Sequence, residues 1–228
     1  MSKPELLEKL AKVVIDGDEE AAKKVAEEAI ATKINPLIAI KEGLAKGMNV
    51  VGKKFHDFEI FLPEILLAAE AMKVAIGVIK PHLTSEEMKR ALAGKVVIGT
   101  VFGDIHDIGK SLVATMLEVA GFEVTDLGRD VPPKQFIEKA KEINADIIAM
   151  SCLLSPSMLY QKDVIDYLKD VGDRDKYWIM VGGAAVTPDW TAEIGADGWG
   201  RHAEDGVEVG KILVEKGKDV NRPVIKGA

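Results

Sequence analysis

Residues 96–110 read VVIGTVFGDIHDIGK, and this stretch decides the fold of the second half of the chain. It begins with the β-branched and apolar run Val96–Val101, passes through the glycine-bounded polar loop Gly103–Gly109, and enters a helical pattern at Lys110. A buried strand, a short loop and a helix in this order begin a βαβ unit. Because ligands of parallel sheets bind beyond the carboxyl ends of the strands, we expect a site in this loop.

The same alternation continues to the end of the chain. Short apolar runs are separated by helical stretches, and they lie at Phe122–Thr125, Ile147–Met150 and Trp178–Val181. A weaker fifth strand is expected near Asp197–Trp199, followed by a last helix over Ala203–Lys216. The pattern predicts a doubly wound, flavodoxin- or Rossmann-like α/β domain with a five-stranded parallel sheet.

The first part of the chain has a helical period instead. Apolar residues recur three and four positions apart between Pro4 and Lys80, and Gly17, Asn35-Pro36 and Pro63 mark expected helix ends. We expect four helices that form an antiparallel bundle. The predicted domains are a helical cap at residues 1–88 and an α/β domain at residues 89–228, with Pro81–Gly94 as a hinge or tether between them.

Composition excludes several classes of function. The net charge of -7 opposes nucleic acid or an anionic membrane surface as a partner. The least polar stretch, Ile147–Tyr160, is shorter than the ~20 apolar residues that span a bilayer. The single cysteine cannot form an internal disulfide, and the first residues do not resemble a signal peptide. We therefore expect a cytoplasmic protein whose partners are small molecules or other proteins.

The loop after the first strand carries the clearest candidate for chemistry. Asp104 precedes His106 by two residues, so its carboxylate can accept a hydrogen bond from one imidazole nitrogen and leave the other free for a metal. A lone Asp-x-His pair is also compatible with an ordinary polar loop. The rest of the sequence has to decide between these interpretations.

The deciding pattern is long-range. After Gly109, the 41 residues 110–150 precede Ser151-Cys152-Leu153, and the 28 residues 154–181 then precede Gly182-Gly183. This combination resembles the cobalamin-binding domain of methionine synthase and of methyltransferase corrinoid proteins. In that family a four-helix cap precedes the α/β domain, and residues 47–52 (GMNVVG) and 61–64 (FLPE) are similar to the cap's signature.

The resemblance implies a role for each matching residue. His106 would be the lower ligand of cobalt, Asp104 its hydrogen-bonded partner and Ser157 the next member of a relay. Ser151 would hydrogen-bond the nucleotide tail of the cofactor, and Phe61 with Leu62 would shield the methyl-bearing face. The cofactor-binding residues implied are Gly103, Asp104, Ile105, His106, Asp107, Gly109, Ser151, Leu153, Ser157, Gly182, Gly183, Phe61 and Leu62.

The glycines near the ends of the strands can be explained without the family resemblance. A corrinoid whose own base is displaced has a long nucleotide tail, and a slot for it needs positions without side chains. The glycines that could form such a slot are Gly99, Gly103, Gly109, Gly182 and Gly183. Tight turns at the ends of strands are the alternative explanation.

The implied function is that of a methyl carrier. The cofactor would be cobalamin or a related corrinoid. Its cobalt, as Co(I), takes a methyl group from a donor that is bound to a substrate-specific methyltransferase. Methyl-Co(III) then passes the group to an acceptor methyltransferase that uses tetrahydrofolate or a thiol, and a reductive activase is a further expected partner. The chain is thus a component of an enzyme, and the donor, a methylamine, betaine, methanol or methoxylated aromatic, is set by the partner.

Other functions share parts of the pattern. The cofactor-binding subunit of an adenosylcobalamin mutase has the histidine motif but is not expected to carry this cap. A cobalamin-dependent sensor needs an output module, and no basic recognition helix is visible. A phosphoacceptor domain of similar topology does not suit a histidine motif followed by paired glycines.

The segment Trp199–Ala203 departs from the corrinoid family, which has smaller or less charged residues there.

Overall fold

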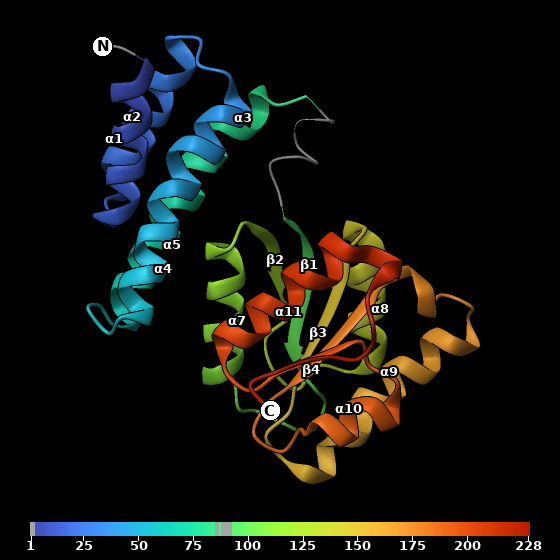
Figure 1. Ribbon diagram of the computed structural model, residues 1–228. Coiled ribbons are helices and arrows are strands. Elements are labelled where there is room, and N and C mark those ends of the chain that lie inside the picture. The colour runs from blue at the N-terminus through green and yellow to red at the C-terminus, as the bar shows by residue number, and fades with distance from the viewer. Residues whose placement is uncertain (1–2, 85–86, 88–92) are drawn as a thin grey trace. The chain divides into compact units, whose positions relative to one another are not determined.

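The chain consists of two compact units in a computed structural model that describes residues 3–84, 87 and 93–228 (Figure 1). One unit comprises Met1–Leu92 with Glu118–Gly121, and the other comprises Ala93–Leu117 with Phe122–Ala228. The boundary predicted between residues 88 and 89 lies outside the described residues, as does most of the predicted connector between residues 84 and 93.

The first unit is helical. Its elements are α1 (Lys3–Ile15), α2 (Glu19–Ala31), α3 (Pro36–Ile38), the π-helix η1 (Ala39–Leu44), α4 (Ala45–His56), α5 (Leu62–Ile79) and the 3-10 helix η2 (Lys80–His82). Caps begin two of the helices, because Asp18 accepts a hydrogen bond from the Ala21 amide at 2.9 Å and Asn35 accepts one from Ile38 at 3.1 Å.

A helical N-terminal region is therefore confirmed, but the expected count of four helices is not. The third predicted helix begins at Pro36 as expected and is then divided by the six-residue π-helical stretch η1. The unit is held together by a core of small and aliphatic side chains, in which Leu10, Leu44 and Met48 are fully buried.

The second unit is a parallel α/β sheet. Its strands are β1 (Gly94–Thr100), β2 (Phe122–Asp126), β3 (Ile147–Ser151), β4 (Trp178–Gly182), β5 (Gly198–Gly200) and β6 (Val224–Lys226), in the order β2-β1-β3-β4-β5-β6. Its α-helices are α7 (Ile108–Val119), α8 (Pro133–Ile143), α9 (Leu159–Asp170), α10 (Pro188–Ile194) and α11 (Ala203–Lys216), and its 3-10 helices are η3 (Ser155–Met158), η4 (Arg174–Lys176) and η5 (Gly217–Asp219).

Helices cover both faces of this sheet. Helices α7 and α11 lie on one face, and α8 and α9 lie on the other (Figure 1). The near-continuous apolar strands are typical of a sheet that is buried on both sides. Because β1, β3 and β4 are parallel neighbours, with Thr100 paired with Ser151 and Ser151 with Gly182, their carboxyl ends lie side by side.

The sheet has six strands, so the predicted count of five is wrong. The additional strand, β6, pairs with β5 through Gly198–Val224, Trp199–Ile225 and Gly200–Lys226. Three residues between Pro223 and Gly227 are too few to show an alternating pattern, and their extended conformation depends on pairing with β5. The five strands expected from the sequence are all present, as is the helix Ala203–Lys216.

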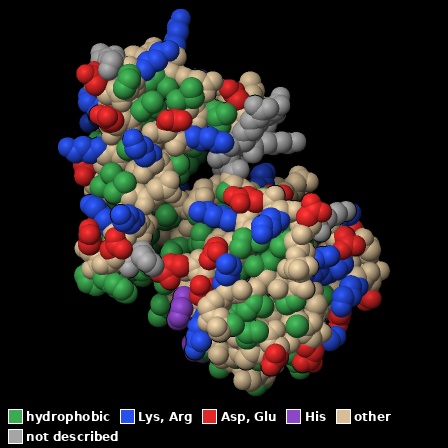
Figure 2. All heavy atoms as spheres, viewed as in Figure 1, with side chains coloured by type: hydrophobic (Ala, Val, Ile, Leu, Met, Phe, Trp, Pro, Cys, Tyr) green, Lys and Arg blue, Asp and Glu red, His purple; other side chains and the backbone are tan. Residues whose placement is uncertain are grey.

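The surface carries charges of both signs. On the face shown in Figure 2, lysines and arginines are interspersed with aspartates and glutamates, without a continuous basic patch. Among the described residues, no helix is long and apolar enough to cross a membrane.

Candidate functional site

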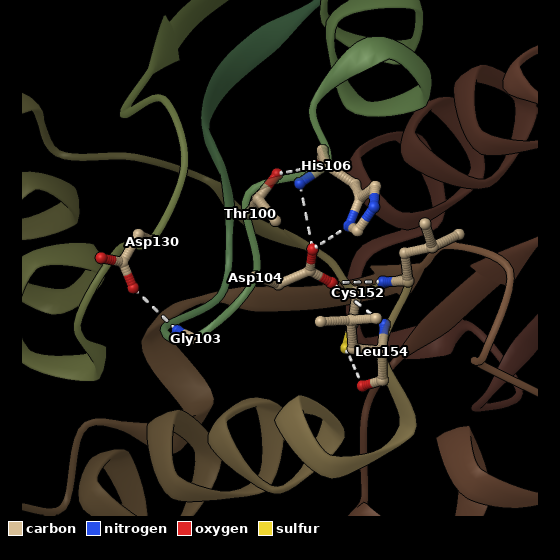
Figure 3. Close-up of polar contacts among 8 residues, drawn as sticks. Thr100, Gly103, Asp104, His106, Asp130, Cys152 and Leu154 are labelled. Carbon is tan, nitrogen blue, oxygen red and sulfur yellow. Dashed lines mark hydrogen bonds and ion pairs between the residues drawn. The ribbon is translucent and has the colours of Figure 1, made fainter.

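The loop between β1 and α7, residues 101–107, is called the histidine loop and is anchored by hydrogen bonds to its surroundings (Figure 3). The Gly103 amide donates to the Asp130 carboxylate at 2.8 Å, and Gly103 has a φ of 76° that favours glycine. The Thr100 hydroxyl donates to the His106 carbonyl at 2.9 Å. Together these contacts set the path of the chain on both sides of Asp104.

Asp104 is fully buried and joins two loops. Its Oδ1 lies 2.7 Å from His106 Nδ1 and accepts from the His106 amide at 3.0 Å. Its Oδ2 accepts from the amides of Leu153 at 2.6 Å and Leu154 at 3.1 Å, in the segment that follows β3. One carboxylate therefore connects the histidine loop to the end of a neighbouring strand (Figure 3).

These contacts keep the carboxylate ionised. Burial by itself raises the pKa of Asp104, but the hydrogen bonds from His106, Leu153 and Leu154 lower it by more, so that the pKa is about 2. An ionised carboxylate only accepts hydrogen bonds, so Nδ1 of His106 must carry the proton in the contact between them. In the neutral imidazole with this tautomer, the other nitrogen, Nε2, has a free lone pair.

The His106 side chain is half exposed and lines a cavity of about 1110 Å³ in the α/β unit. The cavity is formed at the carboxyl ends of β1, β3, β4 and β5 and beside α7 and α11. The predicted site residues that line it are Ile105, His106, Asp107, Gly109, Ser151, Leu153, Gly182 and Gly183. Loops that follow three separate strands thus contribute to one concave surface.

Other predicted residues lie elsewhere. Gly103 and Asp104 do not belong to the cavity lining, and Asp104 supports His106 through the hydrogen bonds described above. Ser157 is buried in η3, but among the hydrogen bonds of the described residues its hydroxyl is not a partner of Asp104. The relay from Asp104 to Ser157 therefore stays a prediction. Phe61 and Leu62 belong to the helical unit, where Phe61 precedes α5 and is 67% exposed.

The glycines separate into two groups. A Cβ atom on Gly182 or Gly109 would meet nothing within 4 Å, and both glycines line the cavity. A Cβ on Gly183 would lie 2.1 Å from the carbonyl oxygen of Cys152, so Gly183 also permits two strand ends to approach closely. The prediction that Gly99 opens a slot is wrong, because its Cβ would lie 2.9 Å from the ring of Phe136 in the core on the α8 side.

Cys152 is a packing residue. Its side chain is fully buried, and its sulfur contacts the Leu154 carbonyl at 3.1 Å. Burial, together with the charge of Asp104, raises the pKa of the thiol to about 11. The group therefore remains a neutral thiol near neutral pH.

Some residues of the cavity were missed by sequence reasoning. Lys110 lines it, as do Trp199, Arg201 and His202, which belong to the segment that the sequence marked only as a departure from a family pattern. The available signal was their position in the sequence. Gly200 ends β5, and Arg201 follows directly, so it lies at the carboxyl end of a strand, where ligands of parallel sheets bind. Only the strand order shows that this edge is continuous with His106.

The geometry fits a cofactor that brings its own metal ligands. A single imidazole with a free Nε2 suits a metal that is held mainly by a macrocycle, and the glycine-lined cavity has room for an attached group. The B12 binding domain family matches residues 94–208, and a second B12 binding domain family matches residues 6–80. The chain belongs to the B12 binding domain family.

Relatives of this B12-binding protein extend over nearly the whole chain. Trimethylamine corrinoid protein 1 of Methanosarcina acetivorans is 49% identical over 206 residues, which are 90% of this chain and 95% of that protein. The dimethylamine corrinoid protein of Methanosarcina barkeri is 46% identical over 214 residues, 94% of this chain and 100% of that protein.

A solved structure is also similar. The methanol:cobalamin methyltransferase complex MtaBC from Methanosarcina barkeri matches with a TM-score of 0.83 and 29% identity, covering 94% of this chain and 81% of that chain. The resemblance inferred from the motifs is confirmed, and so is the cofactor class: this B12-binding protein takes cobalamin or a related corrinoid.

The low pKa of Asp104 predicts a pH-dependent contribution to stability. Because the folded-state pKa lies below the unfolded value of 3.8, the contribution is present above about pH 4 and is lost as pH falls toward 2. The destabilisation caused by Asp104→Asn should therefore be smaller by about 1 kcal/mol at pH ~3 than at pH ~5. Urea unfolding of the wild type and of Asp104→Asn at both pH values measures this difference in the free energy of unfolding. A difference that does not change with pH would contradict the low pKa of Asp104.

The two neighbouring glycines predict opposite phenotypes. Gly183 has a φ of 106°, so Gly183→Ala adds both backbone strain and a clash, and it should destabilise the fold by about 2 kcal/mol or more. Gly182→Ala should leave stability within about 0.5 kcal/mol but weaken corrinoid binding, because the methyl group enters the cavity. Urea unfolding and absorbance titration with cobalamin separate these effects, and unchanged binding by Gly182→Ala would exclude that part of the cavity.

Proposed function

We propose that this chain carries a methyl group on a bound corrinoid between two partner methyltransferases. The observation that supports it best is the Asp104–His106 pair, which presents one free imidazole nitrogen at the mouth of a large cavity. The names of the relatives support a methyl-transfer system of this kind. Residues 89–228 would hold the cofactor, and residues 1–88 would form the cap.

His106 would bind the cobalt through Nε2, since Nδ1 is engaged by Asp104. When bound, the corrinoid supplies a cobalt centre that can accept and release a methyl group. The protein's part is to orient the ligand, and the buried carboxylate does this by holding both the ring nitrogen and the main-chain amide of His106. Ser151, which lines the cavity, would hydrogen-bond the nucleotide tail.

The Asp104–His106 pair can also store a proton. Whenever Nε2 is released from a ligand, the imidazole can be protonated there, and the adjacent carboxylate stabilises the resulting imidazolium. Ser157 is the proposed next member of the relay. The pair would thereby couple ligand release to uptake of one proton.

The proposal requires separate partner proteins. One partner binds and activates the methyl donor, a second passes the methyl group to tetrahydrofolate or a thiol, and a reductive activase restores the cofactor. The relatives named for trimethylamine and dimethylamine support a methylated amine as the donor. The donor would be selected by the first partner, since this chain's cavity is assigned to the cofactor.

In the helical unit, Phe61 and Leu62 are proposed to cover the methyl-bearing face of the corrin ring. Phe61 is 67% exposed within the described structure, so its side chain is not needed for the core of its own unit. An exposed aromatic ring beside a helix start is available for contact with a ligand or partner.

Replacing His106 tests the ligand assignment. Cobalamin bound to protein labelled with 15N-histidine should show, in the electron paramagnetic resonance spectrum of its Co(II) form, an axial nitrogen coupling that changes with the isotope. His106→Gln should abolish the isotope effect, whereas the control His82→Gln, at an exposed histidine of the helical unit, should retain it. A coupling that arises from dimethylbenzimidazole in the wild type would exclude His106 as the ligand.

Replacing Phe61 tests the cover. Because the ring is largely exposed, Phe61→Ala should change the free energy of unfolding by less than about 1 kcal/mol, well below the cost of emptying a core site. It should accelerate photolysis of bound methylcobalamin, since the methyl radical escapes more readily. The control Ile38→Ala removes another exposed apolar side chain of the same unit and should leave photolysis unchanged. Equal photolysis rates in all three proteins would remove Phe61 from the site.

A further inference from the structure

The edge of the cavity beside β5 carries two side chains with N–H donors. Arg201 and His202 directly follow β5, precede α11 and line the cavity together with Trp199. Both side chains are exposed, so their polar groups can reach a ligand at the rim. Neither residue contacts Asp104 or belongs to the histidine loop.

Backbone packing determines the position of this pair. Gly200 allows β5 to approach the start of α11, because a Cβ there would lie 2.5 Å from the Gly206 amide nitrogen. The Arg201 amide donates to the Lys226 carbonyl of β6 at 3.2 Å, and the His202 amide donates to the Asp205 carboxylate at 2.9 Å. The main chain at both residues is therefore anchored while the side chains remain available.

Among the described residues, no carboxylate neutralises the charge of Arg201. Arg174 and Arg222 both pair with Asp197, at 2.8 Å and 3.0 Å. In the described part of the chain, by contrast, no carboxylate lies within 4.0 Å of the Arg201 guanidinium, whose hydrogen-bond partner is the Gly227 carbonyl at 3.4 Å.

The other charged groups of the cavity do not cancel Arg201. Lys110 also lines it, but its ammonium is paired with Asp126. Asp107 is the carboxylate side chain among the lining residues, and it lies in the histidine loop on the β1 side. The terminal residue Ala228 also lines the cavity, but no ion pair within 4.0 Å joins its carboxylate to Arg201. In a chain of net charge -7, an unpaired cation at the β5 edge indicates an anionic ligand group there.

The other residues that line the cavity indicate the chemistry of the rest of the ligand. The walls are largely apolar, with side chains such as Ile98, Met180 and Trp199. A ligand that suits them has an apolar portion inside the cavity and an anionic group near the β5 rim. A corrinoid with a nucleotide tail has this composition, because a phosphodiester in the tail links the arm of the corrin ring to the ribose that carries the base.

We propose that Arg201, with His202 beside it, binds the phosphate of the corrinoid's nucleotide tail and makes the protein select corrinoids that carry the tail. Arginine suits this role, since its guanidinium can donate two hydrogen bonds to one phosphate, and a neutral imidazole can donate a third. This inference rests on entry of the tail into the cavity, which is part of the proposed function.

The test compares a corrinoid that has the nucleotide tail with one that lacks it. Dissociation constants for cobalamin and for cobinamide, which lacks the nucleotide tail, are measured by quenching of tryptophan fluorescence, to which the cavity residue Trp199 contributes. Arg201→Gln should raise the Kd for cobalamin about tenfold and leave that for cobinamide unchanged within about twofold. Arg201→Lys should recover part of the loss, since it keeps the charge and loses the paired donors.

Matched variants and salt complete the experiment. Lys211→Gln removes one positive charge from an exposed position of α11, the helix that follows Arg201 and His202. Lys211 lies outside the cavity, so this change should not alter either Kd. His202→Gln should have a smaller effect than Arg201→Gln, in the same direction. The cobalamin Kd of the wild type should rise with salt more steeply than that of Arg201→Gln.

Two results would overturn the inference: an unchanged cobalamin Kd in a folded Arg201→Gln protein, or an equal loss for both ligands. Equal affinity of the wild type for cobalamin and cobinamide would overturn it as well. The isotope effect on the Co(II) spectrum, read in the same samples, reports ligation by His106 independently. Failure of tail recognition is thereby distinguished from failure of the proposed ligand.

Discussion

The site depends on one buried carboxylate. Removing an ionised carboxyl group from water is costly unless hydrogen bonds replace its hydration, and Asp104 receives them from His106, Leu153 and Leu154. Because these donors come from two loops, the charge joins the ends of β1 and β3 while it orients the imidazole. Orientation of the histidine and stability of the sheet edge thus have the same physical cause.

The cavity follows from parallel pairing around this carboxylate. In the order β2-β1-β3-β4-β5-β6 the strand that precedes His106 is separated from the strand that precedes Arg201 by β3 and β4. Gly183 permits the chain after β4 to approach Cys152, and Gly182 leaves space in the cavity. The result is a long concave edge with an imidazole toward one end and a guanidinium toward the other.

Much of this could be predicted from local pattern. The runs at Val96–Val101 and Ile147–Met150 became β1 and β3 within two residues at each end, since long apolar runs are reliable signals. The pair Asp104–His106 was also predicted, because a hydrogen bond between residues two apart is a local event. The strand β6 was missed because its conformation depends on a partner strand, and Gly99 was misassigned because its neighbour Phe136 is distant in sequence.

The sequence by itself determined the class of the protein: a helical part, a parallel α/β part and membership of a corrinoid-binding family, with His106 as the predicted ligand. It could do so because hydrophobic period and motif spacing are properties of the chain in order. Tertiary structure alone decided that Leu153 and Leu154 donate to Asp104 and that Gly183 packs on Cys152. It also decided that Arg201 lines the cavity without an ion-pair partner among the described residues. These contacts join segments that only strand pairing and helix packing bring together, so no local pattern encodes them.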